Sequence, residues 1–279
     1  MKLSSILSRF NEPETLKMAK LGRELRAQGI NIVDLSLGEP DFNTPEHIKD
    51  AAKKAVDDNW SHYTPVAGYL DLREAICKKL KRDNGLDYTP QQIVVSTGAK
   101  QCIANTMFSI LDDGDEIIIP TPYWVSYSEI ARMTRADVVF VNTTAETKFK
   151  LTPDQLEAAI TPKTKAIVPV HLFGQCAEME QLMVLAKKYN LYVIEDNAQA
   201  IGADYTYSNG KTVKAGTIGH FGTTSFFPSK NLGCYGDGGA LFTNDDELAK
   251  KARSIANHGS TVQYYHDDIG VNSRLDSIQ

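Results

Sequence analysis

Three short stretches of this sequence carry side chains whose types and spacing are suited to chemistry. The first is Ser96-Thr97-Gly98-Ala99-Lys100, which directly follows a short apolar, β-branched run. Small residues at the start of a helix leave backbone N–H groups and the positive helix end free to face an anion, most often a phosphate. We therefore predict a phosphate site that includes Gly98, Ala99 and Lys100. A tight, well-capped turn without any ligand would use the same residues, so this alternative stays open here.

The second stretch runs from Glu195 to Gln199 and directly follows the apolar run Leu191 to Ile194. A carboxylate at the end of a buried strand, here Asp196, lies at the edge of the sheet where ligands bind and can pair with a protonated ring nitrogen. The same carboxylate would also serve as a cap for the segment that follows it. Taken alone, this stretch does not decide between the two roles.

The third stretch, residues 225–233, places Lys230 in a loop with apolar and glycine neighbours, five residues after Ser225. An ammonium group in such surroundings is poorly solvated, and this favours a Schiff base between the lysine and a carbonyl. A lysine in an ordinary surface loop is the alternative. Phe226, Phe227 and Leu232 fit that alternative poorly.

In chain order, the three stretches supply a phosphate seat, a partner for a ring nitrogen and a lysine able to form a Schiff base. These are the parts that pyridoxal phosphate requires of its protein. The combination is far more specific than any one of its parts. We therefore predict pyridoxal phosphate as the cofactor, with Lys230 and Asp196 as the catalytic residues.

Alternating strands and helices must position these stretches. Apolar runs predict strands near 93–95, 116–119, 138–141, 166–170, 191–194, 222–227 and 239–242. Amphipathic segments predict helices at 99–111, 178–189 and 245–257. Two further helices are predicted, one that follows Pro122 and ends near Met133, and one that begins at Pro153. Continuous apolar strands separated by helices indicate βαβ units and a doubly wound, mostly parallel sheet that is buried on both faces. In such a sheet, ligands bind beyond the carboxyl ends of the strands, which is where the three stretches fall.

The segment before residue 90 has a different pattern, with helix candidates at 14–28, 45–58 and 69–84. We expect residues 1–40 to form an arm or part of a smaller domain, and residues 41–260 to form the large cofactor-binding domain. Residues 261–279 would then begin a C-terminal domain that is largely missing from this sequence.

Composition narrows the class of protein further. The chain has 279 residues, 42% of them hydrophobic and 23% charged, with a formal net charge of −5. This balance is typical of a soluble globular protein and argues against nucleic acid as a partner. No apolar run is long enough to span a bilayer, and the first residues do not resemble a secretory signal. The cysteines are scattered, at positions 77, 102, 176 and 234, which favours reduced thiols and a cytoplasmic protein.

Histidine spacing gives no metal-site pattern, so we expect no bound metal. His171 is the one histidine that follows an apolar run directly, in the position where ligand contacts are expected. We therefore keep His171 as a candidate contact to cofactor or substrate.

The sequence resembles the fold-type I pyridoxal-phosphate aminotransferases, and two branches of that family in different stretches. Residues 1–165 resemble a bacterial class I aspartate aminotransferase, through the segments 34–42, 63–68, 94–101 and 122–127. Residues 166–279 resemble the DegT/DnrJ/EryC1/StrS sugar aminotransferases, through the segments 168–175, 195–199, 225–230 and 236–239. The change from one branch to the other falls near Lys165.

This resemblance implies roles for residues around the cofactor. Lys230 would hold it as the internal aldimine, and Asp196 would keep its pyridine nitrogen protonated. Gln199 would reach the ring hydroxyl. Ser225 would bind the phosphate together with the backbone of the Gly98 turn.

Four further residues receive roles by the same resemblance. Trp124 would stack on the cofactor ring, and Gly38 would touch the substrate carboxylate. Tyr63 and Asn272 would be lent to the active site of a neighbouring subunit. The resemblance therefore implies a homodimer with shared active sites.

The implied activity is transfer of an amino group from glutamate or aspartate to a keto acid or a nucleotide-linked keto sugar. A non-catalytic, cofactor-binding or regulatory relative, or an inactive fragment, is the alternative. Two class I features are absent: Pro169–Leu172 stands where an Asn-Pro-x-Gly pattern is expected, and Gly233–Gly236 stands where an arginine is expected. Both branches also continue for on the order of a hundred residues more, a typical small-domain length.

Overall fold

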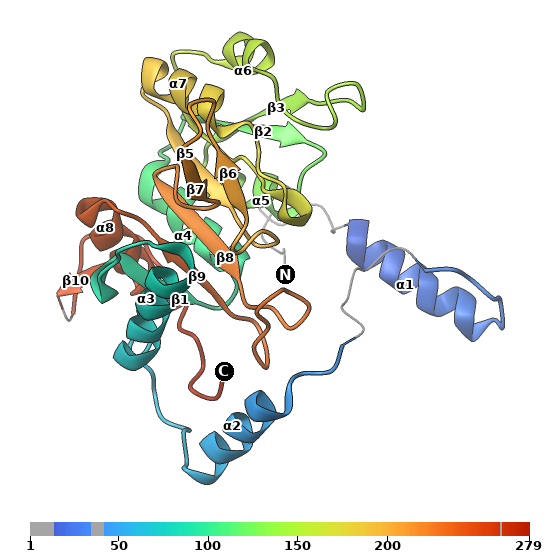
Figure 1. Cartoon of the computed structure of the whole chain (residues 1–279), viewed down its shortest axis with the longest axis vertical. Helices are drawn as coiled ribbons and strands as arrows, with labels where there is room; N and C mark the ends of the chain where they lie inside the picture. Colours follow the sequence, from blue (N-terminus) through green and yellow to red (C-terminus); the bar gives the residue numbers. More distant parts are fainter. Residues whose placement is uncertain (1–13, 35–41, 263) are drawn as a thin grey trace, which may run out of the picture.

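The fold is built on a seven-stranded sheet. It is seen in a computed structural model that describes residues 14–34, 42–262 and 264–279 (Figure 1). The strands follow the order β1-β9-β8-β5-β4-β2-β3. Their bounds are β1 Ile93–Ser96, β2 Glu116–Thr121, β3 Asp137–Asn142, β4 Thr164–Ile167, β5 Tyr192–Asp196, β8 Phe221–Ser225 and β9 Gly239–Phe242. All seven strands predicted from apolar runs are present, and the mostly parallel α/β sheet is confirmed.

Strand β9 is the exception to the parallel arrangement. It pairs antiparallel with β1 on one side and with β8 on the other, whereas β8, β5, β4, β2 and β3 pair in parallel. The first residue of β9, Gly239, is in register with Ser96, the last residue of β1, and with Ser225, the last residue of β8. Three chain segments therefore meet at the edge where the parallel strands end.

Side-chain alternation along the strands divides the core between the two faces of the sheet. On β2, Ile117 and Ile119 pack on one face, and Ile118 packs on the other. The first face is covered by α4 (Ala99–Ile110), α5 (Ser126–Met133) and α8 (Asp246–Ala256). The opposite face is covered by α6 (Pro153–Ala159), α7 (Met179–Tyr189) and, beneath β1 and β9, by α3 (Leu70–Asn84). The sheet is thus doubly wound.

Helix α6 shows how local sequence sets an element boundary. The hydroxyl of Thr152 accepts a bond from the Gln155 N–H at 3.3 Å, and the Gln155 side chain accepts one from the Thr152 N–H at 3.1 Å. Pro153 occupies the first helical position, where a missing N–H costs nothing. The start predicted from Thr152-Pro153 is confirmed.

The first two described helices lie outside the layers around the sheet. Figure 1 shows α1 (Glu14–Ala27) standing apart from the sheet, with Met18 and Leu21 exposed. Helix α2 (Glu46–Asp57) has no buried residue. Both helices were predicted, together with α3. The placement of α1 fits the expected arm, but the boundaries of the domains stay predictions.

Three features were not predicted from the sequence. Two are small antiparallel pairs, β6 (Asp204–Thr206) with β7 (Thr212–Lys214), and β10 (Ser260–Val262) with β11 (Tyr265–His266). The third is the return of the last residues to the sheet. Leu275 packs in the cluster that contains Leu80 and Ile93, and its carbonyl accepts a bond from the Thr64 hydroxyl at 3.0 Å. Residues near Leu275 therefore share the core of the large sheet.

Candidate active site

Asp196 is the last residue of β5 and is almost completely buried. Its Oδ1 accepts a hydrogen bond from the Ala198 N–H at 2.9 Å, and its Oδ2 accepts one from the Tyr127 hydroxyl. Burial raises the pKa of Asp196, while these two donors and the nearby Lys230 and His171 side chains act in the opposite direction. The carboxylate predicted to face a ring nitrogen therefore lies in a dry, partly compensated environment.

Tyr127 was not predicted as a site residue. It lies in the first turn of α5, its ring is buried, and its backbone N–H bonds the Trp124 carbonyl at 3.0 Å. Burial and the charge of Asp196 raise the pKa of Tyr127 well above its ordinary value, so it is a neutral donor. Ile130 and Ala131, three and four residues later, share its buried face, and this helical spacing indicates burial without indicating the partner.

Lys230 lies in the loop after β8 and is half-buried. Its N–H bonds the Phe227 carbonyl at 2.8 Å, and the bonds from Phe226 N–H to Gly238 and from Cys234 N–H to Phe226 hold the two sides of the loop together. The charge of Lys230 is close enough to lower the pKa of Asp196. The two residues predicted to be catalytic thus lie on neighbouring parts of the sheet, Asp196 at the end of β5 and Lys230 in the loop after its partner strand β8.

The predicted phosphate seat is assembled from β8, β9 and the start of α4. Ser225 is buried, and its Oγ accepts a bond from the Phe227 N–H at 3.2 Å. Gly98 caps α4 with a φ of 96°, and no side chain caps that helix. The N–H groups of its first turn are therefore available to an anion. A Cβ on Gly239 would lie 2.5 Å from the Gly98 carbonyl carbon and 2.6 Å from the Ala99 nitrogen, so only glycine permits this approach.

Trp124 and Lys100 lie next to each other beside this turn. The Nζ of Lys100 is 5.3 Å from the centroid of the Trp124 ring, a cation–π distance, and the indole is 44% exposed. Gln199 lies on another side of Asp196, where its Oε1 accepts a bond from the Phe173 N–H at 3.4 Å. Their predicted contacts to a cofactor ring remain predictions. Gly38 lies outside the described residues.

Tyr63 and Asn272 are not brought to the Asp196 group. Tyr63 is 88% exposed and lies under the guanidinium of Arg274, 4.8 Å from its ring centroid. Asn272 is exposed and forms an isolated backbone bridge with Asn257. Their predicted role was toward a neighbouring subunit, and this role stays a prediction.

His171 is fully buried, and both of its ring nitrogens are bonded within the protein. Its Nδ1 accepts a bond from the Ala177 N–H at 3.2 Å, so Nε2 carries the proton and donates to Glu195 Oε2 at 2.8 Å. Its backbone N–H bonds the Asp196 carbonyl at 3.0 Å. A substrate contact through this ring would first have to break one of these bonds. The geometry instead makes His171 a support for the end of β5.

Glu195 was also missed, although a charged residue directly at the end of an apolar run was a visible signal. Its carboxylate is fully buried and accepts four hydrogen bonds. One comes from His171, and three come from the N–H groups of Gly216, Ile218 and Gly219 at 2.9, 2.6 and 2.5 Å. Glu195 thereby fastens the loop that precedes β8 to strand β5.

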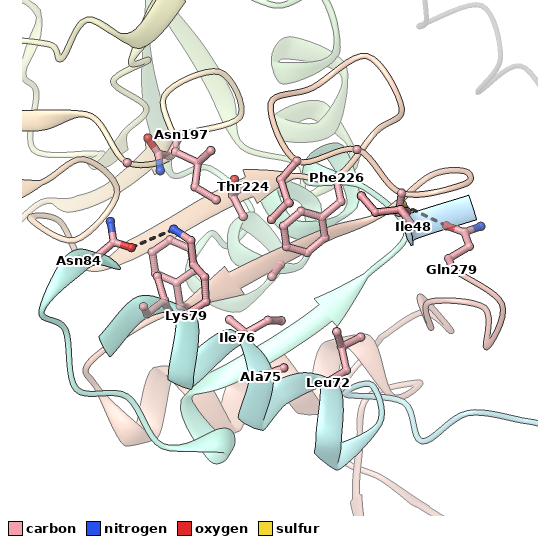
Figure 2. A pocket seen from close by; sticks show the side chains of 18 of the residues that line it. Ile48, Leu72, Ala75, Ile76, Lys79, Asn84, Asn197, Thr224, Phe226 and Gln279 are labelled. Carbon is pink, nitrogen blue, oxygen red and sulfur yellow. Dashed lines mark hydrogen bonds between the residues drawn. The ribbon is translucent and has the colours of Figure 1, made fainter. Parts of the chain in front are cut away.

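A cavity of about 440 Å³ lies beside this group, between α2, α3 and the sheet. Figure 2 shows Leu72 and Ile76 on one side of it and Thr224 on the other. Asn197 and Thr224 line the cavity and are the chain neighbours of Asp196 and Ser225. Lys230, Asp196 and Ser225 are not among its lining residues. Because successive residues of a strand face opposite sides, the cavity and the candidate active site lie on different faces of β8.

Neither a metal site nor a membrane span is found in the part of the chain that the structure describes. No three His, Cys, Asp or Glu residues there are grouped so as to hold a metal ion. None of its helices has the length and apolar character needed to cross a bilayer.

Comparison with known proteins identifies the family of this chain. The sequence profile of the DegT/DnrJ/EryC1/StrS aminotransferase family matches residues 87–279. The chain belongs to this family.

Its relatives include both of the branches that the sequence resembles. An aspartate/prephenate aminotransferase of Cereibacter sphaeroides is 49% identical over 163 residues, which are 58% of this chain and 41% of the relative. A UDP-2-acetamido-2-deoxy-3-oxo-D-glucuronate aminotransferase of Pseudomonas aeruginosa is 47% identical over 192 residues, 65% of this chain and 52% of the relative. The chain thus spans about half the length of the curated relatives it matches.

The fold is also that of a solved aminotransferase. The aspartate aminotransferase of Thermus thermophilus with maleate superposes with a TM-score of 0.81 and 32% sequence identity, over 100% of this chain and 70% of that chain. The fold-type I architecture predicted from the sequence is therefore confirmed.

Proposed function

We propose that this chain is a pyridoxal-phosphate-dependent aminotransferase that takes its amino group from glutamate or aspartate. The observation that carries the proposal is that the buried Asp196, at the end of β5, and the loop after β8 that holds Lys230 lie at the same carboxyl edge of the sheet, beside the uncapped start of α4. An amine, a buried carboxylate and an anion seat in one place match the aldehyde, the ring nitrogen and the phosphate of this cofactor.

The residues present fit the cofactor in three respects. The seat at Gly98 and Ser225 offers backbone N–H groups and a hydroxyl to the phosphate. Each oxygen of Asp196 has one bonded donor in the protein and can accept another, because a carboxylate oxygen has two lone pairs. Gly239 leaves the turn before α4 free of side-chain atoms.

When bound, pyridoxal phosphate supplies a protonated ring that accepts electrons from the substrate α-carbon. Asp196 holds the proton on the ring nitrogen through its negative charge. The Nζ of Lys230 would hold the group covalently at rest. When an amino donor takes its place, this Nζ would be free to accept the proton of the substrate α-carbon as a general base and to return one as a general acid.

Two classes of acceptor remain candidates, a keto acid and a nucleotide-linked keto sugar. The stretch before Lys165 favours the first, since the Cereibacter sphaeroides relative is named an aspartate/prephenate aminotransferase. The stretch after it favours the second, since the Pseudomonas aeruginosa relative is named for a nucleotide sugar. A cytoplasmic homodimer, with Tyr63 and Asn272 reaching the neighbouring subunit, is part of the same proposal.

The test is a spectroscopic titration of the purified chain with pyridoxal phosphate and then with glutamate or aspartate. We expect a visible absorbance band on binding and its shift to shorter wavelength with either donor. Lys230→Ala and Asp196→Ala should both abolish the donor-induced shift. Lys211→Ala, an exposed lysine in the turn between β6 and β7, is the matched control and should behave like the wild type.

A full shift that survives Lys230→Ala would refute the proposal. The absence of any band in the wild-type chain would favour the non-catalytic alternative. Reloading the aminated protein with oxaloacetate or with a nucleotide-linked keto sugar then distinguishes the two acceptor classes, because only the true acceptor restores the original band.

A further inference from the structure

Tyr127 is a buried core residue, but its hydroxyl bonds the carboxylate of Asp196, a candidate catalytic residue. Among the described residues, two donors reach that side chain, the Tyr127 hydroxyl at Oδ2 and the Ala198 N–H at Oδ1. The second is a local bond within the loop after β5. Tyr127 therefore supplies the one bond that fixes the carboxylate against another element.

Tyr127 is itself held rigidly. Its ring is buried in the same cluster as Ile130 and Ala131 of α5, and its N–H is bonded to Trp124. A buried ring has little freedom to move, so the phenol oxygen stays in one place, and its O–H points to its acceptor, Asp196 Oδ2. The rotation of the Asp196 carboxylate is thereby set from α5, 69 residues away in the chain.

The contact also crosses the point at which the sequence changes its resemblance. Tyr127 lies in the stretch similar to aspartate aminotransferases, and Asp196 lies in the stretch similar to sugar aminotransferases. A bond between them makes the orientation of Asp196 depend on both stretches.

On this basis, and resting on the proposed function, we propose that Tyr127 is a positioning residue for the ring nitrogen of the cofactor. It acts through Asp196, by holding the carboxylate in one rotation with an acceptor position free for the ring N–H. The predicted consequence is that Tyr127 determines how strongly the chain prefers a pyridine ring over a benzene ring of the same shape.

The groups around Asp196 favour this role. Tyr127 of α5 bonds its carboxylate, the backbone N–H of His171 bonds its carbonyl, and the charge of Lys230, in the loop after β8, lowers its pKa. On α4, the buried thiol of Cys102 has a raised pKa, owing to burial and in smaller part to the charge of Asp196. Because burial raises the pKa of Asp196, loss of the phenol would raise it further and make the charged form scarcer.

The test compares Tyr127→Phe with a matched control, Tyr123→Phe. Tyr123 is in the same segment, is half-buried, and donates its hydroxyl to Ser128 Oγ at 3.3 Å instead of to Asp196. The probes are pyridoxal phosphate and its analogue in which the ring nitrogen is replaced by C–H, with all other substituents kept. Dissociation constants are measured for both probes by equilibrium dialysis.

We expect the wild type and Tyr123→Phe to bind pyridoxal phosphate more tightly than the carbon analogue. In Tyr127→Phe, affinity for pyridoxal phosphate should fall about tenfold, and affinity for the analogue should hardly change, as expected for a lost bond to a charged group. In an Asp196→Asn background, Tyr127→Phe should have no further effect on the preference.

A second readout needs no cofactor. In the cofactor-free protein, the carboxyl ¹³C signal of Asp196 should titrate at higher pH in Tyr127→Phe than in Tyr123→Phe or the wild type, because the phenol favours the charged form. An unchanged titration, or equal weakening of both probes, would overturn the inference. Failure of the wild type to bind either probe would overturn the proposed function as well, so the two failures are distinguishable.

Discussion

Two adjacent buried carboxylates at the end of β5 are compensated in different ways. Glu195 accepts four hydrogen bonds and has no acceptor capacity left. Asp196 accepts only two, and burial raises its pKa. A saturated buried charge is a structural tie, whereas an unsaturated one is costly unless a ligand completes it. This difference supports a structural role for Glu195 and the catalytic role proposed for Asp196.

His220 gives a prediction at the same scale. Its Nδ1 accepts the Val193 N–H at 3.0 Å, which requires a neutral ring, and burial lowers the pKa of His220 from 6.5. Because the folded pKa lies below the unfolded one, the unfolded chain binds more protons between the two values. The contribution of His220 to stability is therefore complete above pH 6.5 and is lost as the pH falls from there toward the folded pKa.

We expect His220→Asn, which keeps an acceptor but cannot titrate, to lose less stability than the wild type between pH 7.5 and pH 5.5. Urea denaturation at the two pH values measures this difference. His62→Asn, at an exposed position, is the control and should follow the wild type. A wild-type loss that persists unchanged in His220→Asn would contradict the prediction.

At the scale of elements, the contact between β9 and the start of α4 depends on one missing methyl group. A Cβ on Gly239 would collide with the backbone of Gly98 and Ala99, which cannot swing aside as a side chain can. Gly239→Ala should therefore displace the turn before α4 and lower the unfolding free energy by about 1–3 kcal/mol. We expect pyridoxal phosphate affinity to fall at least about tenfold, because the proposed function places the phosphate on the N–H groups that would be displaced.

The control for this prediction is Gly114→Ala. Gly114 has a φ of 86° and no atoms near its missing Cβ, so alanine there costs about 1 kcal/mol of left-handed strain and leaves the site intact. The dissociation constants of both variants for pyridoxal phosphate and their midpoints of urea denaturation test this prediction. Equal cofactor affinity in the two variants would argue against the role given to Gly239.

The sequence predicted the elements well because each depends on local pattern. Apolar β-branched runs marked the strands, and Thr152-Pro153 marked a helix start. The direction of β9 was missed because an apolar run carries no direction. The residues that join β8 to β9, 226–238, nevertheless have no helical pattern. A connection between two parallel strands normally contains a helix, so this absence was a signal for an antiparallel β9. The β6–β7 hairpin had a signal as well, in Asn209-Gly210.

The site residues show the same difference between features that a local pattern marks and features that packing determines. Lys230, Asp196 and Gly98 were proposed as site residues from their local settings at a strand end, in an apolar loop or at a helix start, and Ser225 from the family resemblance. Tyr127 could not be proposed from the sequence, because the acceptor of its hydroxyl, Asp196, is 69 residues away in the chain. Long-range pairs of this kind are set by how the elements pack, and no local pattern records them.

At the scale of the whole molecule, the last described residues complete the core around β1. Leu275 is 5% exposed and packs with Leu80, Ile93, Val95 and Phe242. Leu275→Ala should lower the unfolding free energy by about 2–4 kcal/mol, through lost burial and the cavity it leaves. Ile278→Ala, at a position that is 43% exposed, should cost about 1 kcal/mol or less.

Urea denaturation of both variants measures this difference. Similar small losses would mean that the segment near Leu275 contributes little to the folded body. A large loss in Leu275→Ala alone would show that the sheet requires this segment for its stability.

The antiparallel strand between β1 and β8 also sets an order of events during synthesis. Strand β1 lies at the end of the sheet, and its one strand partner there, β9, begins at Gly239, which is 143 residues after Ser96 (239 − 96). At about 5–20 residues per second, the ribosome needs roughly 7–30 s to cover that distance. Throughout this interval, the nascent chain carries β1 without its strand partner.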